Sequence, residues 1–373
     1  MEGPLPHIRT LTLTRFRNYA ALAWSPPPGL VGVVGPNGSG KTNLLEAISL
    51  LSPGRGLRNA RTDQLARQGE GGDGSWAVHA RILSPTGPVE LATGVLPGTE
   101  RRQVRIDGDI IRGQAELGAH ITTVWLTPQM DRLFQEGPAG RRRFLDRLVY
   151  GLEPAHAREV AAQAASLTER ARLLAMRADP AWLAAVEDSI ARHATAVTAS
   201  RLAYVTRLND VLVQGGAGGF PPARLDLNCA IATRLSRHPA VEVEDWLRAA
   251  LRDSRETDGE SGTQGIGAHR SDLLMKDAAT GRSASIASTG QQKALLIGVT
   301  LGHAVLLKAV RGRAPVMLLD EPMTHLDAER RRLLLTALRG LGGQGFLTAT
   351  DRDAFDADLS CVTCLEGCLH PVS

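Results

Sequence analysis

Eight consecutive residues near the N-terminus have the types and spacing of a loop that binds phosphate groups. They are Gly35, Pro36, Asn37, Gly38, Ser39, Gly40, Lys41 and Thr42, which fit the pattern GxxxxGK[ST]. Glycines let backbone N–H groups curl around a polyphosphate, and the start of a following helix adds partial positive charge. In such a loop the ammonium group of Lys41 contacts the β- and γ-phosphates, and the hydroxyl of Thr42 binds Mg²⁺. The pattern therefore predicts binding of a nucleoside triphosphate with Mg²⁺, and we include the next residue, Asn43, in the predicted site.

Two adjacent carboxylates follow a short apolar segment far along the chain. Residues 316–319 are Val, Met, Leu and Leu, and Asp320 and Glu321 come directly after them. A strand in the middle of a parallel sheet is buried on both faces, so its sequence is continuously apolar. At the end of such a strand Asp320 can hold Mg²⁺ through water, and Glu321 can act as general base on an attacking water. With the loop, the pair predicts a site that hydrolyses ATP, with Lys41, Asp320 and Glu321 as its catalytic residues.

A third group of residues comes before that apolar strand. Ser288, Gly290 and Gln291 open a helix predicted over 293–310, and Asp327 lies six residues beyond the second carboxylate. Ser and Gly at a helix start are ordinarily a cap, but their position here resembles the signature motif of ATP-binding-cassette (ABC) ATPases. In that class the signature of one subunit closes on the γ-phosphate held by another. The resemblance implies that Ser288, Gly290 and Gln291 act in trans and that Asp327 lines the seam of an ATP-dependent homodimer.

The elements that must position these groups follow from the hydrophobic pattern. The apolar run 30–34 predicts a strand leading into the loop, and 42–48 predicts the helix after it. Segments of alternating apolar and polar residues, separated by Pro and Gly turn signals, predict an antiparallel meander: 8–16, 76–83, 89–95 and 101–106, with turns at 84–87, 97–98 and 107–108.

The central part of the chain is predicted to be mainly helical. Two long helical stripes are joined by a short connection in which Asp179 caps the second helix and Pro180 occupies its first turn, so the two form an antiparallel hairpin. The elements predicted here are helices at 141–152, 154–174 and 180–211, a flexible connection at 215–219, a strand at 225–231, a helix at 243–251, a mobile loop at 254–267, and strands at 272–275 and 283–286.

Together these elements predict an α/β fold. We expect a P-loop NTPase of ABC-ATPase type with an antiparallel β subdomain and an inserted helical lobe. The expected ATPase lobe is assembled from both chain ends, 1–125 and 266–373, and the mainly helical lobe II spans 126–265.

Bulk composition limits the function classes. The chain has 373 residues, of which 43% are hydrophobic and 22% charged, as is ordinary for a globular protein. Its formal net charge of +4 and pI near 9.1 mildly favour a polyanionic partner. No stretch approaches the ~18–20 uninterrupted apolar residues of a membrane span, and the first residues lack the order of a signal peptide. We therefore expect no membrane partner and a cytoplasmic location.

Four segments resemble motifs of one family within the ABC class, the RecF recombinational-repair proteins. Residues 15–19 (Arg-Phe-Arg-Asn-Tyr) are similar to the family's N-F-R-N-Y segment, and 140–146 (Gly-Arg-Arg-Arg-Phe-Leu-Asp) to its R-R-R-F-L-D stretch. Residues 267–272 (Gly-Ala-His-Arg-Ser-Asp) resemble G-P-H-R-x-D, and 288–291 match S-x-G-Q. Their order and spacing over nearly the whole chain make the resemblance specific.

Three positions differ from the family or class pattern. Glu321 stands where the family commonly has a second Asp. Gln129 stands where the family usually has Glu after a proline, and we assign it to the Q-loop that senses the γ-phosphate. Thr350 occupies the place where transporter cassettes carry a switch histidine, so the identity of the γ-phosphate sensor stays open.

The resemblance implies an ATP-dependent DNA-binding dimer of recombinational DNA repair, the SOS response and replication-fork maintenance. Such proteins bind single- and double-stranded DNA at gaps and junctions and hydrolyse ATP slowly, with DNA as the stimulus. With RecR and RecO partners they help to load the RecA recombinase. The resemblance also implies that Arg17 contacts the nucleotide.

Three basic segments have two interpretations each. Residues 141–143 and 330–332 are runs of three arginines that face DNA phosphates or are simply solvated, and charge runs are usually solvated. His269 and Arg270 contact the nucleotide or signature elements, or have a purely structural role.

The C-terminal cysteines also allow two interpretations. Cys361, Cys364, Cys368 and His370 have a spacing that suggests a zinc site. A terminal hairpin with its turn at Glu366 and Gly367 fits the same residues equally well.

Other ATPase classes compete with the repair function. The main alternative is the nucleotide-binding subunit of an ABC transporter, but the interval between Lys41 and Ser288 is longer than such a cassette normally carries. A chromosome-organising ATPase needs long coiled-coil arms, for which the helices at 141–213 are too short. In a small-molecule kinase the signature-like helix would have no role.

Overall fold

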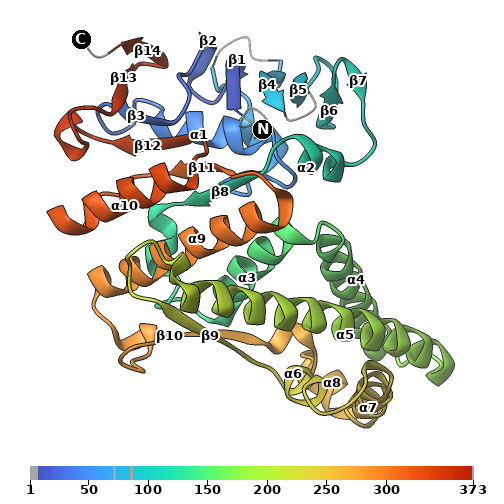
Figure 1. Cartoon of the computed structure of the whole chain (residues 1–373). Coiled ribbons are helices and arrows are strands. Elements are labelled where there is room, and N and C mark those ends of the chain that lie inside the picture. Colours follow the sequence, from blue (N-terminus) through green and yellow to red (C-terminus); the bar gives the residue numbers. More distant parts are fainter. Residues whose placement is uncertain (1–6, 70–72, 85–86, 372–373) are drawn as a thin grey trace. The chain divides into compact units, whose positions relative to one another are not determined.

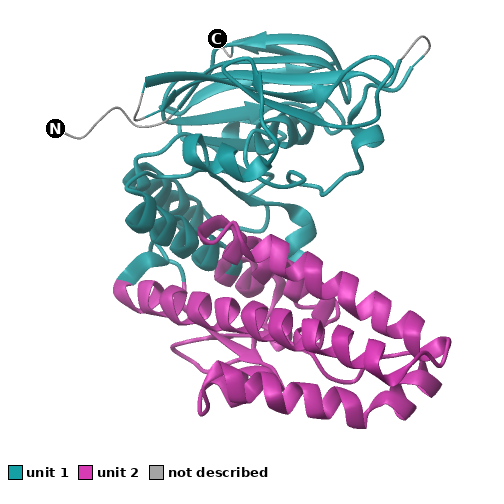
Figure 2. Ribbon diagram, turned by 90° about the vertical axis from the view of Figure 1, so that its right-hand side faces the viewer, with its two compact units in different colours: residues 1–131, 215–220, 296–373 teal, residues 132–214, 221–295 magenta. Residues whose placement is uncertain are grey.

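The computed structural model describes residues 7–69, 73–84 and 87–371, which fall into two compact units (Figure 1). Unit 1 comprises residues 1–131, 215–220 and 296–373, and unit 2 comprises 132–214 and 221–295 (Figure 2). These limits differ from the predicted lobe boundaries at 125 and 266. Residues 266–295 join unit 2, in which strand β10 (Asp272–Asp277) pairs with β9 (Ala223–Asn228).

The first sheet of unit 1 is the predicted antiparallel meander. Its strand order is β2-β1-β4-β5-β6-β7, and the strands are β1 (His7–Phe16), β2 (Tyr19–Trp24), β4 (Trp76–Ser84), β5 (Gly87–Val95), β6 (Gln103–Ile106) and β7 (Asp109–Ile110). The four predicted strands are confirmed as β1, β4, β5 and β6, whereas β2 and β7 were not predicted. Residues 85–86 of the predicted turn lie outside the described residues.

The second sheet of unit 1 carries the segments singled out for chemistry. Its order is β14-β13-β3-β12-β11-β8, and the strands are β3 (Leu30–Val34), β8 (Thr123–Leu126), β11 (Val316–Leu319), β12 (Gly345–Ala349), β13 (Ser360–Leu365) and β14 (Cys368–Pro371). Neighbouring strands from β13 to β8 are parallel. Because β12 lies between β3 and β11, the carboxyl ends of these three strands meet at one edge, where ligands bind in open parallel sheets.

The core of unit 1 lies between its two sheets and contains helix α1 (Lys41–Ser49) (Figure 1). Leu44, Leu45 and Ile48 of α1 are fully buried in one cluster with Leu11 of β1 and Phe346 of β12. Helix α10 (Ala328–Leu341) lies on the other side of the second sheet (Figure 1). The short elements of unit 1 are α2 (Leu117–His120) and 3₁₀ turns at Thr62–Leu65, Gln114–Glu116, Pro128–Arg132 and Arg352–Ala354.

Unit 2 is mainly helical, as predicted. Its helices are α3 (Pro138–Leu152), α4 (His156–Ala175), α5 (Pro180–Val211), α6 (Ala230–Leu235), α7 (Ala240–Asp253) and α8 (Arg255–Ser261). Helices α4 and α5 form the predicted hairpin, and the Asp179 carboxylate accepts a hydrogen bond from the Ala181 N–H as an N-cap. Fully buried residues of α5, α6 and α7, such as Ile190, Ile231 and Leu247, form its core.

Three local predictions in unit 2 were wrong. The stretch 254–267 is not a loop throughout, because α8 occupies Arg255–Ser261 and buries Asp258. The predicted strand at 283–286 is a 3₁₀ turn over Ala284–Ile286, and only Ser283 bridges to β10. The strand at 225–231 ends at Asn228, after which α6 begins. Each error concerns a short segment whose structure depends on a partner distant in sequence.

Helix α9 (Thr289–Arg311) is the one described helix that is long and apolar enough to cross a membrane by length and composition. Within its most apolar window 78% of the residues are buried inside the protein. A core helix meets the same criteria, so this observation is weak support for a membrane span.

Candidate nucleotide-binding site

The predicted phosphate-binding loop connects β3 to α1, and its glycines are required by its path. Gly35 has φ +152° and Gly40 has φ +114°, both in the region that favours glycine. A Cβ at Gly35 would lie 2.3 Å from the Cys364 carbonyl oxygen, and one at Gly40 would lie 2.4 Å from Asn18 Nδ2. The loop therefore packs so closely against Cys364 and Asn18 that a residue with a side chain at Gly35 or Gly40 would displace the loop.

Asn18 and Tyr19, which follow β1, are hydrogen-bonded to the backbone of this loop. Asn18 Nδ2 donates to the Ser39 carbonyl at 2.9 Å, and Asn18 Oδ1 accepts from Asn43 Nδ2 at 2.7 Å. The Tyr19 hydroxyl donates to the Gly40 carbonyl at 3.0 Å. Burial, reinforced by the neighbouring Cys364 thiol, raises the pKa of Tyr19 far above its usual value, so this hydroxyl remains a donor. Asn43, predicted to contact nucleotide, is thus hydrogen-bonded to this segment.

Arg17 contacts helix α1 behind the phosphate-binding loop. Its guanidinium donates to Glu46 Oε2 at 2.9 Å and to Oε1 at 2.8 Å, and Glu46 is a fully buried residue of α1. Arg58 donates to the same carboxylate at 3.1 Å. Two arginines thus neutralise a buried acid behind the loop, and a contact between Arg17 and nucleotide stays a prediction.

Lys41 and Thr42, the last residues of the motif, point to different partners. The ammonium group of Lys41 is buried and donates to the carbonyls of Gly35 at 2.7 Å and Pro36 at 3.0 Å. The Thr42 hydroxyl lies 3.0 Å from each carboxylate oxygen of Asp320. The structure therefore brings the loop and the acidic end of β11 together.

A residue that sequence reasoning missed links the two adjacent carboxylates. Thr348 in β12 donates its hydroxyl to Asp320 Oδ1 at 2.8 Å, and the Thr348 hydroxyl oxygen accepts the Glu321 N–H at 2.8 Å. Glu321 has φ +49°, an uncommon value for a residue with a side chain. The available signal was a hydroxyl inside an otherwise apolar, fully buried strand.

Gln129, the predicted Q-loop residue, and Thr350, at the position of the switch histidine, lie at the same edge of the sheet. Gln129 is exposed in the 3₁₀ turn that follows β8, and β8 pairs with β11. The Thr350 hydroxyl follows β12 and donates to Asp351 Oδ2 at 2.9 Å. A hollow of about 380 Å³ is lined there by Glu321, Arg331, Thr348, Thr350 and Asp351, among others. The assignment of Gln129 to the Q-loop stays a prediction, and the identity of the γ-phosphate sensor stays open.

The residues at this edge fit ATP and Mg²⁺. Among the described residues Ser39 Oγ is buried and has no hydrogen-bond partner, so the loop retains an unsatisfied hydroxyl. A Cβ at Gly38 would meet no atom within 4 Å, which leaves the loop open on that side. The hydroxyl of Thr42 and the carboxylate of Asp320 are oxygen ligands of the kind Mg²⁺ prefers. Lys41 supplies a cation for phosphate oxygens.

The signature residues lie in unit 2 at the start of α9. Ser288 Oγ accepts from the Gln291 N–H at 3.3 Å, and Gln291 Oε1 accepts from the Ser288 N–H at 3.1 Å. This reciprocal pair is a capping box, and both residues are exposed. In unit 1, Asp327 is the N-cap of α10 and accepts from the Arg330 N–H at 2.8 Å, with its side chain 60% exposed. Action of Ser288, Gly290, Gln291 and Asp327 across a dimer seam stays a prediction.

The arginines at 141–143 are neither a solvated run nor an open phosphate-binding patch. Arg141 makes two hydrogen bonds of 2.7 and 2.9 Å to the Asp272 carboxylate, and this pairing raises the pKa of Arg141. Arg142 donates to the Ser271 carbonyl at 2.7 Å. Only Arg143 of the three is exposed. Two segments of family resemblance are thus joined inside unit 2.

The arginines at 330–332 lie in the first turns of α10. Arg331 Nε donates to the Leu326 carbonyl at 3.0 Å, and Arg330 approaches Asp327 at 3.8 Å. At least two of the three side chains therefore have local partners beside the helix start. Contact of these arginines with DNA stays a prediction.

His269 and Arg270 have structural partners in unit 2. His269 Nε2 donates to the Gln264 carbonyl at 3.2 Å, and Arg270 Nε donates to the same oxygen at 2.7 Å. Burial lowers the pKa of His269, and the charges of Arg270 and Arg142 lower it further. The imidazole is therefore neutral near pH 7, and its contact with nucleotide stays a prediction.

The C-terminal cysteines lie in the hairpin of β13 and β14. Leu365 pairs with Cys368, and the turn residues Glu366 and Gly367 both have positive φ, as a two-residue hairpin turn requires. Cys361 and Cys364 are three residues apart on one strand, so their side chains point to opposite faces. Among the residues from 7 to 371 that are described, no group of three or more potential metal ligands gathers.

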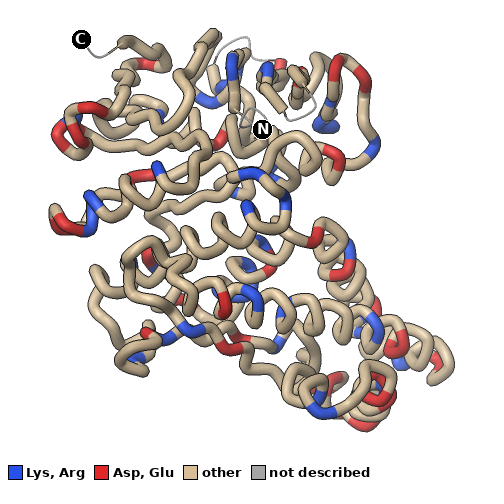
Figure 3. The backbone as a smooth tube through the Cα atoms, viewed as in Figure 1, with Lys and Arg blue, Asp and Glu red and all other residues tan. Residues whose placement is uncertain are grey.

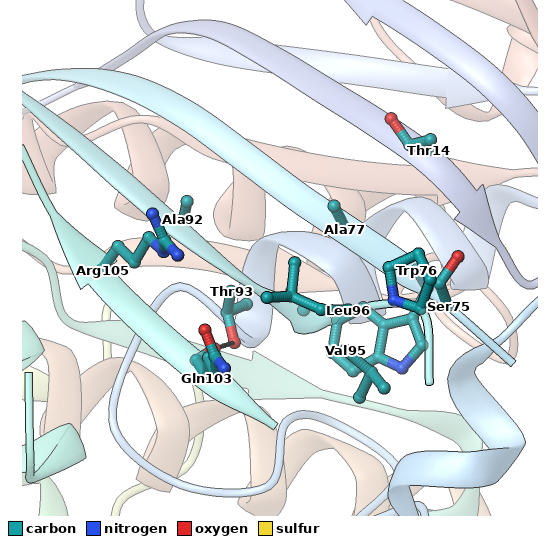
Figure 4. Close-up of a pocket in the computed structure, with 12 residues that line it drawn as sticks. Thr14, Ser75, Trp76, Ala77, Ala92, Thr93, Val95, Leu96, Gln103 and Arg105 are labelled. Carbon is teal, nitrogen blue, oxygen red and sulfur yellow. Dashed lines mark hydrogen bonds between the residues drawn. The ribbon is translucent and has the colours of Figure 1, made fainter. Parts of the chain in front are cut away.

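A separate hollow of about 210 Å³ lies on the antiparallel sheet of unit 1 (Figure 4). It is lined by side chains from four strands, including Thr14 of β1, Ala77 of β4, Ala92 of β5 and Gln103 of β6, with the buried Trp76 beside them. None of these residues belongs to the predicted nucleotide site.

Known proteins share both the sequence and the fold of this chain. The sequence model of the RecF/RecN/SMC N-terminal domain family matches residues 7–363. The chain is 44% identical over 356 residues to the DNA replication and repair protein RecF of Mesorhizobium japonicum, which covers 94% of this chain and 93% of that protein. It is 43% identical over 355 residues to the RecF of Brucella suis, covering 94% and 91%.

Two solved structures show the fold. The recombination mediator protein RecF with ATP in the RecFOR pathway superposes with a TM-score of 0.86 at 22% identity, covering 100% of this chain and 99% of that one. An Smc head bound to the C-terminal winged-helix domain of ScpA gives a TM-score of 0.55 at 16% identity, covering 98% and 97%.

These matches confirm the predicted α/β fold of ABC-ATPase type and select among the alternatives. The sequence likeness extends over nearly the whole chain, so it includes the helical unit that a transporter cassette would not account for. On that basis this chain belongs to the RecF family of DNA replication and repair proteins.

Proposed function

We propose that this protein is a slow, DNA-stimulated ATPase of recombinational DNA repair, two copies of which close on ATP and so hold DNA. One observation carries the proposal. The Thr42–Asp320 hydrogen bond joins the phosphate-binding loop to the acidic strand end, 278 positions apart, in a chain of the RecF family. These groups form one site only because the parallel strands β3 and β11 end at the same edge of the sheet.

Each residue of the site has a role in the proposed hydrolysis. Lys41 neutralises charge on the β- and γ-phosphates, and Ser39 Oγ donates to a phosphate oxygen. Thr42 and Asp320 hold Mg²⁺, which when bound neutralises charge that develops on the phosphates. Glu321 takes a proton from the water that attacks the γ-phosphorus, as the bond to the bridging oxygen of ADP breaks.

A second copy of the chain completes the site in this proposal. The start of α9 presents exposed Ser288 and Gln291, and a helix start favours anions through its free N–H groups and dipole. Gly290 lets the backbone approach closely. Asp327, largely exposed at the start of α10, lines the seam. A shared γ-phosphate stabilises the closed dimer because it makes these contacts only in that state.

DNA and mediator proteins are the proposed partners, with DNA bound at gaps and junctions. The support is the family: the relative from Mesorhizobium japonicum is a DNA replication and repair protein, and the RecF solved with ATP is a recombination mediator of the RecFOR pathway. We extend this to RecO and RecR partners, to RecA loading and to a cytoplasmic location. Residues 240–261 carry seven acidic and three basic side chains (Figure 3), and of the acidic ones only Asp258 is buried, so the surface of α7 and α8 would repel DNA phosphates.

The proposal is tested by measuring the molecular mass of the protein by light scattering without nucleotide, with ADP and with ATP, each with and without gapped DNA. We expect a dimer with ATP, and Glu321→Gln should bind ATP normally and accumulate that dimer. Ser288→Arg should bind ATP but neither dimerise nor turn over, whereas Ser285→Arg, which adds the same charge in the exposed turn before it, should behave as wild type. A monomeric Glu321→Gln variant with bound ATP would reject the proposal.

DNA binding is tested by its response to salt. If about five phosphates are neutralised, the log–log slope of affinity against salt should be roughly −4 to −5. A flat response would show that the protein does not clamp DNA through its phosphates.

A further inference from the structure

Thr348 is a buried hydroxyl placed between the two acids of the candidate site. Strand β12 lies between β3 and β11, so its end reaches the gap between the phosphate-binding loop and Asp320. Thr348 is 0% exposed. Its hydroxyl donates to Asp320 Oδ1 and accepts the Glu321 N–H, both at 2.8 Å. One side chain therefore contacts both neighbours on the adjacent strand end.

Position 348 is fully buried in a strand, an environment that favours valine over threonine. The presence of a hydroxyl there therefore requires an explanation. The residues of β12 are Gly, Phe, Leu, Thr and Ala, all buried. Valine has nearly the same shape as threonine, suits a strand and needs no polar partner. A buried hydroxyl costs free energy unless it is hydrogen-bonded. The threonine is thus explained by its two polar bonds and not by packing.

The two bonds act on different features of the site. Asp320 Oδ1 accepts from both Thr348 and Thr42, which fixes the carboxylate against rotation. Glu321 adopts φ +49°, a strained conformation that persists only where the surroundings determine it. Thr348 accepts the N–H that this conformation directs toward β12. The hydroxyl therefore fixes the carboxylate on one side and the backbone of the proposed base on the other.

We infer that Thr348 is a positioning residue that orients Asp320 toward Mg²⁺ and Glu321 toward the attacking water. This inference rests on the proposed function of the same site. In this inference Thr348 acts through Asp320 and Glu321, to which its hydroxyl is hydrogen-bonded, and not by contact with the reacting atoms. Loss of such an outer partner typically lowers metal affinity or activity by roughly 10–100-fold.

The test compares Thr348→Val, which keeps the shape and removes the hydroxyl, with Thr348→Ser, which keeps the hydroxyl. The first measurement is binding of a fluorescent ATP analogue as a function of Mg²⁺ concentration, and the second is kcat and KM for ATP. For Thr348→Val we expect the half-saturating Mg²⁺ concentration to rise about tenfold or more and kcat to fall by a similar factor. Binding without Mg²⁺ should be unchanged, and Thr348→Ser should be within a few-fold of wild type.

Thr198→Val is the matched control. Thr198 is also 0% exposed, and its hydroxyl donates to the Ala194 carbonyl in α5 of unit 2. It should match Thr348→Val in the loss of thermal stability and leave the Mg²⁺ dependence at the wild-type value. If Thr348→Val does not fold, Thr348→Ala serves in its place and should show the same rise in half-saturating Mg²⁺.

The outcomes separate this inference from the proposed function. If the wild-type protein binds no ATP with Mg²⁺, the proposed function fails. If wild type binds but Thr348→Val has the same Mg²⁺ dependence and kcat, only the positioning role is overturned. Equal changes in Thr198→Val would show that the effect is general destabilisation.

Discussion

The buried charged groups of unit 2 and the phosphate-binding loop of unit 1 differ in how fully their hydrogen bonds are satisfied. In unit 2, Arg170 is fully buried and donates to Glu187 at 3.0 Å, to Asp258 at 2.7 Å and to the Leu251 carbonyl at 2.6 Å. These partners join α4 to α5, α7 and α8. Arg201 and His156 likewise donate to Asp146. Unit 2 therefore pairs its buried charges with one another.

The candidate site in unit 1 leaves part of its polar capacity available. Lys41 has three N–H donors and directs two of them to loop carbonyls. Ser39 Oγ is buried without a partner among the described residues. Behind the loop the pattern changes, because Glu46 is neutralised by Arg17 and Arg58. The contrast teaches that paired charges fix the architecture, whereas incompletely satisfied groups at the sheet edge are those suited to a ligand.

The largest effect is expected from a substitution that removes Arg170 from its network of buried partners in unit 2. Arg170→Ala leaves Asp258 buried without its cation, whereas Glu187 keeps Arg255. Removing one partner of a buried ion pair typically costs about 3–5 kcal/mol of folding free energy. Because Arg255 still neutralises Glu187, we expect a loss of about 3 kcal/mol. Urea unfolding monitored by tryptophan fluorescence measures it. Arg172→Ala, two positions along α4 in an exposed pair with Glu169, should change stability little, and equal losses would contradict the comparison.

The second effect concerns binding and not folding. Lys41→Ala should weaken ATP binding by about 100-fold or more, which is roughly 2.8 kcal/mol, because the cation for the phosphates is lost. Calorimetric titration measures the affinity, and retained micromolar binding would overturn the site assignment. Lys308→Ala is the matched control, since Lys308 also donates to a carbonyl, that of Leu341, and should bind ATP as wild type does.

The smallest effect is a pH dependence that arises from Asp146 in unit 2. Burial opposes ionisation of Asp146, but hydrogen bonds from His156 and Arg201 outweigh it and hold the pKa of Asp146 below its usual 3.8. Its stabilisation is therefore fully present above about pH 4 and is lost as the pH falls through the lower folded-state value. Asp146→Asn should lose less stability than wild type between pH 5 and 3, measured by thermal unfolding. Asp210→Asn, an exposed position on α5, should keep the wild-type pH profile.

Local sequence was sufficient to predict loops, helix starts and turns, because the residues that determine each of them lie within a few positions of one another. The loop at 35–42 and the Asp179-Pro180 helix start lie where they were predicted, and of the two interpretations of the C-terminus the structure shows the hairpin with its turn at Glu366-Gly367. The physical reason is that a turn, a cap or an amphipathic period is encoded by neighbours in the chain. The family resemblance rested on the same kind of short motif.

Only the tertiary structure decided the partners of the polar groups. Arg141 and Asp272 are 131 positions apart, and Arg170 and Asp258 are 88 apart, so no local pattern predicts their pairing. Helix α8 was missed because its polar sequence is fixed by the buried contact of Asp258. The sequence by itself determined the loop, the acids and the strands that carry them. The strand order of the sheet, which places β12 between β3 and β11, decided that Thr348 contacts both acids. Strand order depends on how distant segments pack together and not on any residue's neighbours in the chain.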